Sequence, residues 1–208
     1  MTSPARTSPS RTAPPAPGFA DPVLDAQRCF RSLLAALAGP MQALSLDACP
    51  PSPPEPLGPA AAAVALTLFD ADTPVWLDPR ADRPEIRDFL LFHCGCPLTP
   101  EPGEAAFALL LDPAAAPRLS AFRCGEEEYP DRSATLVLQV DAFDPAGPVF
   151  RGPGIETSRR LAPRPLPPGF WDQARANHAL YPLGVDVFFV AGAQLAGLPR
   201  TTAIEEAV

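Results

Sequence analysis

The chain has 208 residues, of which 47% are hydrophobic and 19% are charged, and its formal net charge is −8. This length predicts a single domain with a substantial core. The acidic balance argues against nucleic acid or an anionic membrane as the main partner, because both require a basic face. The low charged fraction predicts exposed apolar surface that a partner protein covers.

All 16 basic residues are arginine, so the chain contains no lysine. Schiff-base enzymes, including those that use pyridoxal phosphate, require a lysine amine, and a P-loop requires a lysine that binds phosphate. Both classes are therefore excluded, and we expect no cofactor. The five cysteines are an odd number without a secretory signal segment, which indicates reduced thiols. No apolar run is long enough for a membrane helix, so we expect a cytoplasmic protein.

The first part of the chain is predicted to hold a disordered tail and then a surface helix. Residues 1–18 are rich in proline, serine and arginine and cannot bury enough apolar surface to fold, so the single domain is expected over residues 19–208. Asp21 caps the helix, Pro22 occupies its first turn and Gly39 ends it. The apolar residues that recur at helical spacing, and that we expect to face the core, are Val23, Ala26, Phe30, Leu33, Leu34 and Leu37.

The stretch from residue 60 to residue 77 organises the rest of the domain. Residues 60–69 are apolar on every side of a helical projection, which predicts a helix buried among other elements. The Asp70-Ala71-Asp72 turn ends this helix, and the proline after Thr73 starts an extended segment. The apolar strand that follows, residues 75–77, is expected inside a sheet that helices cover.

Strands and helices alternate along the remaining chain. The predicted helices cover residues 84–95, 114–122 and 170–180. The predicted strands cover residues 41–46, 105–111, 136–140, 149–155, 185–191 and 194–198, with a hairpin turn at Gly147-Pro148 and surface loops at 49–59 and 163–168. This order predicts an α/β fold, a layered sandwich with a mixed β-sheet flanked by helices.

His93, Cys94 and Cys96, with Cys124 as a fourth ligand, form the most obvious candidate metal site, because histidine and cysteine bind zinc. The C-x-C spacing, however, is shorter than the C-x2-C spacing that suits a tetrahedral ion, and no second paired motif occurs. We therefore expect no metal site. We interpret His93 as a hydrogen-bonded residue at the end of its helix, where a positive charge suits the helix dipole.

Several carboxylates are candidates for acid–base chemistry. Asp70 and Asp72 have the right residue types for this chemistry or for magnesium, but their position at a helix end favours capping. Asp186 lies in an apolar strand, where an unpaired carboxylate is costly, so it requires a partner, either Arg200 or a backbone amide. Arg200-Thr201-Thr202 either grips an anion or forms a solvated segment, and the sequence leaves both interpretations open.

Short motifs between about residue 19 and residue 202 resemble, as an ordered set, the PhnH family, the H subunit of the bacterial carbon-phosphorus lyase system. The motifs are D-P-V-x-D-A-Q-x-x-F at 21–30, D-T-P-V-W-L at 72–77, F-H at 92–93 with P-L at 97–98, G-P-G-I at 152–155, Y-P-L-G-V-D at 181–186 and L-P-R-T-T at 198–202. The sequence departs from the family pattern at Cys94-Gly95-Cys96, where other residue types are usual.

The resemblance implies a reduced form of the fold of PLP-dependent transferases that has lost the cofactor. It also implies a homodimer that joins the G, I and J subunits of the lyase complex. Together with the G, I and L subunits, the family supports the transfer of ribose triphosphate from ATP to a phosphonate during phosphonate degradation. No catalytic residue is established for the family, so none is assigned. We expect an accessory subunit that is not catalytic alone.

Two other hypotheses come from the same residues. In the first, the chain is a binding module with a pocket for a nucleotide or a phosphonate. The candidate residues of that pocket are Asp72, Thr73, His93, Arg200, Thr201 and Thr202. In the second, the chain is an independent enzyme, for instance a hydrolase that uses His93 with Asp72.

Overall fold

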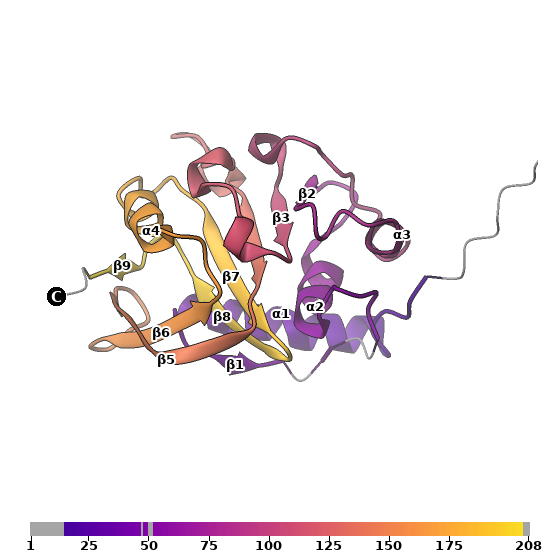
Figure 1. Cartoon of the computed structure of the whole chain (residues 1–208), viewed down its shortest axis with the longest axis horizontal. Coiled ribbons are helices and arrows are strands. Elements are labelled where there is room, and N and C mark those ends of the chain that lie inside the picture. The colour runs from indigo at the N-terminus through magenta and orange to yellow at the C-terminus, as the bar shows by residue number, and fades with distance from the viewer. Residues whose placement is uncertain (1–14, 47, 50–51, 206–208) are drawn as a thin grey trace, which may run out of the picture.

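A computed structural model describes residues 15–46, 48–49 and 52–205 of the chain. Its centre is a mixed sheet of six strands in the order β1-β8-β7-β4-β3-β2 (Figure 1). The strands are β1 (Leu44–Ser45), β2 (Val75–Leu77), β3 (Phe107–Leu110), β4 (Thr135–Gln139), β7 (Asp186–Ala191) and β8 (Gln194–Leu198). Strands β2, β3, β4 and β7 are parallel, whereas β8 is antiparallel to β7 and β1 is antiparallel to β8.

A second sheet is antiparallel and has three strands in the order β6-β5-β9. Its strands are β5 (Ala142–Arg151), β6 (Arg159–Arg164) and β9 (Ala203–Ile204). The α-helices of the described residues are α1 (Pro22–Ala38), α2 (Pro59–Leu68), α3 (Pro84–His93) and α4 (Phe170–His178). The predicted α/β class with a mixed sheet is confirmed, whereas the small second sheet was not predicted.

Alternating side chains along the central strands divide the core into two parts. Phe188 and Val190 of β7 pack on the side that holds α1, α2 and α3. Val187 and Phe189 pack on the other side, where α4 and the small sheet cover the central sheet. The fold therefore has three layers: helices α1 to α3, the central sheet, and α4 together with the small sheet.

Helix α2 is buried on every side, as the sequence predicts. Residues 60–65 are each at most 1% exposed, because α2 packs against α1 and α3 and against the central strands β4 and β7. Its alanines let neighbouring chain segments approach closely, and the Cys29 thiol of α1 donates a hydrogen bond to Ala63 O at 3.5 Å. The predicted turn after the helix is also confirmed, since the Asp72 amide donates to the Asp70 carboxylate at 3.0 Å.

The expectation that residues 75–77 lie inside the sheet is wrong, because β2 is an edge strand. The segment after α3 covers this edge. Val75 N donates to Pro97 O at 2.8 Å, and Thr99 N donates to Val75 O at 3.0 Å. The loop therefore satisfies the outward backbone groups of Val75 and covers the start of this edge strand.

Helix α1 is the predicted surface helix, and the Asp21 carboxylate accepts hydrogen bonds from the amides of its first turn. Its buried face, formed by Cys29, Leu33 and Ala36, shares only Leu33 with the predicted face. Gly197 of β8 explains the difference, since a Cβ there would lie 2.7 Å from Ala36 O. The helix thus docks through small residues. The predicted core residues that are instead exposed are Val23, Phe30 and Leu34.

The region from residue 142 to residue 164 departs most from the prediction. Gly147-Pro148 is not a hairpin turn, because β5 runs through it and pairs with β6 and β9, not with β4. The register shifts between Asp144 and Val149, and prolines, which lack an N–H, are tolerated at such an irregularity. The predicted loop at 163–168 begins as part of β6.

Two smaller elements also differ. The helix predicted over residues 114–122 is instead two short 3-10 turns, Pro113–Ala115 and Leu119–Ala121, because Pro117 interrupts the segment. The predicted edge strand at 41–46 does lie at a sheet edge, but only Leu44–Ser45 pairs.

The proline-rich segment before α2 is more than a surface loop. In its described part, Leu57 is buried. The Gln139 amide at the end of β4 donates to Pro56 O at 2.9 Å and accepts from Gly58 N at 2.7 Å. The segment is therefore fastened to the carboxyl edge of the central sheet.

The packing of α2 generates a test. Replacing Ala62, which is fully buried, with leucine should destabilise the protein by about 1–3 kcal/mol, because the added volume has no space to occupy. Urea denaturation followed by tryptophan fluorescence measures this loss. The matched control, Ala35→Leu at an exposed position of α1, should change stability by no more than about 0.5 kcal/mol. Equal effects would contradict close packing around α2.

Candidate functional site

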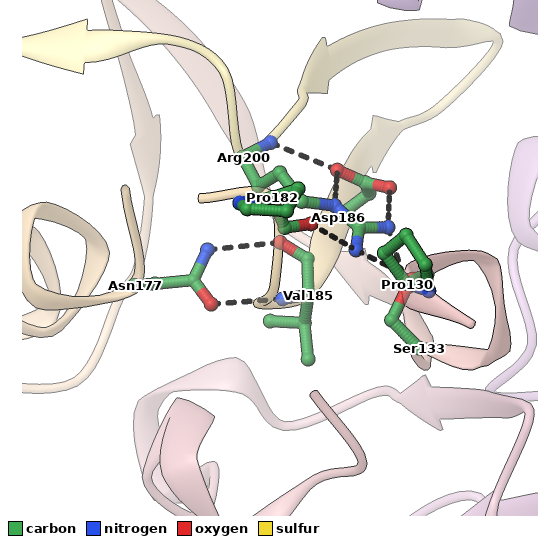
Figure 2. Close-up of polar contacts among 7 residues, drawn as sticks. All are labelled: Pro130, Ser133, Asn177, Pro182, Val185, Asp186 and Arg200. Atoms are coloured by element: carbon green, nitrogen blue, oxygen red, sulfur yellow. Dashed lines mark hydrogen bonds and ion pairs between the residues drawn. The ribbon is translucent and has the colours of Figure 1, made fainter. Parts of the chain in front are cut away.

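The most extensive polar cluster lies where β7 begins and β8 ends (Figure 2). Asp186 opens β7, and the antiparallel return of β8 brings Arg200 beside it. The Arg200 backbone amide donates to Asp186 Oδ1 at 2.8 Å, Nε donates to the same oxygen at 3.1 Å, and Nη2 donates to Oδ2 at 2.6 Å. The two side chains are only 13% and 20% exposed. The predicted pairing of Asp186 with Arg200 is confirmed.

The other guanidinium N–H groups of Arg200 fasten two further segments. Nη1 donates to Pro130 O at 3.0 Å and to Pro182 O at 3.4 Å, and Nη2 donates to the Ser133 hydroxyl. An arginine side chain has five N–H donors, and these contacts together with those to Asp186 engage all of them. Arg200 therefore acts as a structural tie between the loop before β4, the turn before β7 and the end of β8.

Helix α4 is attached to the same place. The Asn177 side-chain amide donates to Val185 O at 2.9 Å, and Val185 N donates to Asn177 Oδ1 at 2.8 Å (Figure 2). The His178 ring nitrogen Nδ1 lies 2.8 Å from Arg200 O. These three contacts fix α4 relative to β7 and β8.

The two threonines that follow Arg200 are in different environments. Thr201 is half-buried. Thr202 is 1% exposed, and its hydroxyl has no hydrogen-bond partner among the described residues. It borders a cavity of about 10 Å³ between α4, β8 and β9. A cavity of this size holds one water molecule at most, so it is no pocket for a nucleotide or a phosphonate.

The remaining candidate residues lie elsewhere in the fold. The Thr73 hydroxyl forms hydrogen bonds with the backbone N–H and C=O of Asp70 in the turn before β2, and Asp72 belongs to the same turn. This turn lies at the amino end of β2, four strand positions from β8 and hence about 19 Å from Arg200 across the sheet. The six predicted residues therefore do not converge on one pocket.

His93 is the last residue of α3, as predicted, and its Nε2 lies 2.9 Å from Ala16 O. A Cβ on Gly18 would lie 3.0 Å from the same ring. The histidine thus holds the segment that leads into α1. Residues 1–14 of the predicted tail lie outside the described residues. Among the described residues, the His93 ring forms no hydrogen bond or ion pair with Asp72, so the pair proposed for a hydrolase is not hydrogen-bonded.

Near His93, the Cys94 side chain contributes to the packing of α3 against α2. The Cys94 thiol donates to Ala65 O of α2 at 3.6 Å, and Cys124 donates to Phe122 O at 3.4 Å in a different loop. A hydrogen bond between the thiols of Cys94 and Cys96 raises the pKa of Cys94 and lowers that of Cys96. Among the described residues, no group of three or more His, Cys, Asp or Glu side chains is placed to hold a metal ion.

Sequence analysis missed Asp78, which directly follows β2 and is 3% exposed. Its carboxylate accepts hydrogen bonds from Ala81 N and from Asp112 N, both at 2.7 Å. Burial raises the pKa of Asp78, although the two amide donors act in the opposite direction. The residue connects the loops after β2 and β3, which is a structural role. Its position between an apolar strand and Pro79 was the sequence feature that could have indicated a buried structural aspartate.

A larger concave feature was also missed, because it depends on the unpredicted strand β6. A groove of about 960 Å³ lies between α4 and the β5–β6 hairpin. Its polar side chains include Arg160 and Arg164 of β6 and Arg175 of α4, and Trp171 lies beside them. None of these residues was a candidate at the outset.

These features define a class of protein: an α/β domain in which the polar side chains of the sequence motifs hold segments of the chain together, and whose described residues also form an arginine-lined groove. In the described residues, no helix has the length and apolar character needed to cross a membrane. Residues 17–205 match the family model described as bacterial phosphonate metabolism protein (PhnH). The chain therefore belongs to the PhnH family.

Two curated relatives agree with this assignment. The alpha-D-ribose 1-methylphosphonate 5-triphosphate synthase subunit PhnH of Rhizobium meliloti (strain 1021) is 44% identical over 190 residues, covering 90% of this chain and 94% of that protein. Protein HtxG of Stutzerimonas stutzeri, provisionally named as a C-P lyase subunit, is 43% identical over 84 residues, covering 39% of this chain and 43% of that protein.

The Asp186–Arg200 pair generates a second test. Asp186→Asn should cost about 3 kcal/mol of stability, because it leaves a mostly buried guanidinium without its counter-charge. Chemical denaturation gives the value. The control is Asp82→Asn, which removes the carboxylate from the exposed Asp82–Arg87 pair and should cost at most about 1 kcal/mol. If the two variants lose the same stability, Arg200 is not the tie described above.

Proposed function

We propose that this chain is a subunit of an alpha-D-ribose 1-methylphosphonate 5-triphosphate synthase in organic phosphonate catabolism. In this role it supports the transfer of ribose triphosphate from ATP to a phosphonate, and it is not catalytic alone. The observation that carries the proposal is the 44% identity to the Rhizobium meliloti subunit, which extends over nearly the whole of both chains. Similarity of this extent concerns the complete domain and not one motif.

The proposal includes the partners and the ancestry that the family resemblance suggests. The chain forms a homodimer, joins the G, I and J subunits of the carbon-phosphorus lyase complex, and works in the cytoplasm. Its fold is a reduced form of the PLP-dependent transferase fold. The sequence has no lysine to hold that cofactor as a Schiff base, which is consistent with such a reduction.

The disposition of the polar motifs supports an accessory role. Arg200 uses its N–H donors within the fold, Asp186 is its partner, and His93 holds the segment before α1. A catalytic group must reach its substrate in a suitable geometry. The motif residues of this chain instead contact other parts of the same chain.

Exposed apolar side chains supply a surface for assembly. Val23, Phe30 and Leu34 lie along one side of α1 and are 77%, 46% and 52% exposed. We name these three residues the α1 apolar stripe. A contiguous apolar stripe on a helix is typical of a surface that a protein partner covers. We propose that another subunit of the synthase packs on it.

Co-expression with the G, I and J subunits, followed by size-exclusion chromatography, tests the proposal. The chain should elute with its partners as one complex. Elution as a separate monomer, in the presence of folded partners, would count directly against membership of the complex. A substantial phosphonate turnover by the isolated chain would contradict the accessory role.

The α1 apolar stripe gives a specific version of this test. The double variant Phe30→Glu/Leu34→Glu should remain folded by circular dichroism, because both side chains are exposed, but should lose most of its co-elution with the complex. The control, Ala35→Glu/Gln42→Glu, adds the same charge at two other exposed positions and should co-elute as the natural protein does. Unchanged co-elution of the stripe variant would show that the α1 apolar stripe is not part of the interface.

A further inference from the structure

The groove between α4 and the β5–β6 hairpin is lined in part by small residues of the hairpin, among them Gly147, Val149 and Ala162. Val149 of β5 pairs with Arg160 of β6, and Ala162 lies two residues further along β6, so these residues share one face of the small sheet. The start of α4 and the segment before it line the groove together with this hairpin. The volume of about 960 Å³ lies within the range of small-molecule sites.

Arginines border this groove on two sides. Arg160 and Arg164 stand on the same face of β6, four residues and therefore about 13 Å apart. Arg175 lies on α4, one turn after Trp171, and faces the groove from the opposite wall. Trp171 is held in place by edge-to-face contacts with Phe150 and Phe170, at centroid distances of 5.4 and 5.1 Å. The arginines are thus spread along an elongated space.

Two of these arginines form ion pairs with carboxylates near the groove, but these pairs are weak. Arg164 pairs with Asp144 at 3.2 Å, and Arg175 pairs with Asp172 at 2.5 Å. At least one member of each pair is well exposed, so each pair is worth only about 0–1 kcal/mol and an anion can replace it. Glu205, the other acid of the lining, is neutralised by Arg151 from outside the groove.

Arg160 is the most available cation of the groove. It donates to Gly147 O at 3.2 Å, and the described residues place no carboxylate within ion-pair distance of it. The groove therefore carries a local positive charge on a chain whose formal net charge is −8. A guanidinium matches two phosphate oxygens at once, and it is the usual residue for phosphate recognition through paired hydrogen bonds.

We infer that this groove binds an organic polyphosphate, with its phosphate groups held by Arg160, Arg164 and Arg175. A single phosphate is too small to reach arginines about 13 Å apart along β6, whereas an elongated ligand with several phosphates spans that distance. The choice of a polyphosphate as ligand rests on the proposed function, because the Rhizobium meliloti relative is named for a 5-triphosphate product.

Isothermal titration calorimetry on the full chain tests the inference, with inorganic tripolyphosphate and with ATP as probes and EDTA present to remove metal ions. Both probes should bind, and their affinity should fall as salt is added, because the contacts are ionic. The double variant Arg160→Gln/Arg164→Gln should bind at least about tenfold more weakly, because it loses two guanidinium groups that donate charge-assisted hydrogen bonds to the phosphates. Both side chains are exposed, so the variant should fold.

The matched control is Arg31→Gln/Arg80→Gln, which removes the same charge at two exposed positions outside the groove and should leave the affinity unchanged. No heat with either probe would overturn the inference. Equal binding by the groove variant and the natural protein would also overturn it, because binding would then reflect another site. An acidic peptide that binds in place of both probes would assign the groove to a protein partner and would refute the polyphosphate.

The same variant separates this inference from the proposed function. The Arg160→Gln/Arg164→Gln variant should still co-elute with the other subunits, because the groove lies outside the α1 apolar stripe. Co-elution of the natural chain without polyphosphate binding would refute the groove alone. Polyphosphate binding by a chain that does not join the complex would refute the proposed function alone.

Discussion

The ion pair between Asp186 and Arg200 is the constraint on which the arrangement of this molecule depends. Asp186 opens a strand whose next five residues are buried, and a carboxylate there is tolerated only with a counter-charge. Arg200 supplies it and uses its other N–H groups on the segments before β4 and β7. Because His178 and Asn177 attach α4 to the same place, this cluster also positions one wall of the arginine-lined groove.

A feature could be predicted from the sequence where its absence would leave a residue or a helix in an environment that costs free energy. A charge inside an apolar strand requires a partner, which left Arg200 and a backbone amide as the two candidates, and a helix that is apolar on every side requires burial, which identified α2. The edge position of β2 and the buried face of α1 could not be predicted, because they depend on how distant segments meet. β6 was missed because Pro163 and the prolines that follow the strand are typical of a loop, and the groove was missed with it.

Because the chain has no lysine, every cationic contact is made by a planar guanidinium. Exposure decides what that group does. Arg200 is 13% exposed and its N–H groups all contact the protein, so it fixes loops relative to strands. Arg160 is exposed and makes one backbone contact, so most of its donors face solvent. One residue type thus serves as an internal tie in one place and as an available cation in another.

The α1 apolar stripe and the groove belong to different layers of the fold, with the central sheet between the elements that carry them. A partner on α1 therefore does not need to cover the groove, and a ligand in the groove does not need to displace a partner. The layers nevertheless touch near the end of α1, where Arg159 of β6 donates to Pro40 O and Gly154, between β5 and β6, lies against Ala38 O. Since Arg160 directly follows Arg159, any energetic coupling between assembly and ligand binding has a direct structural route. By thermodynamic linkage, a ligand in the groove would then change the affinity for the partner by the same factor as the partner changes the affinity for the ligand.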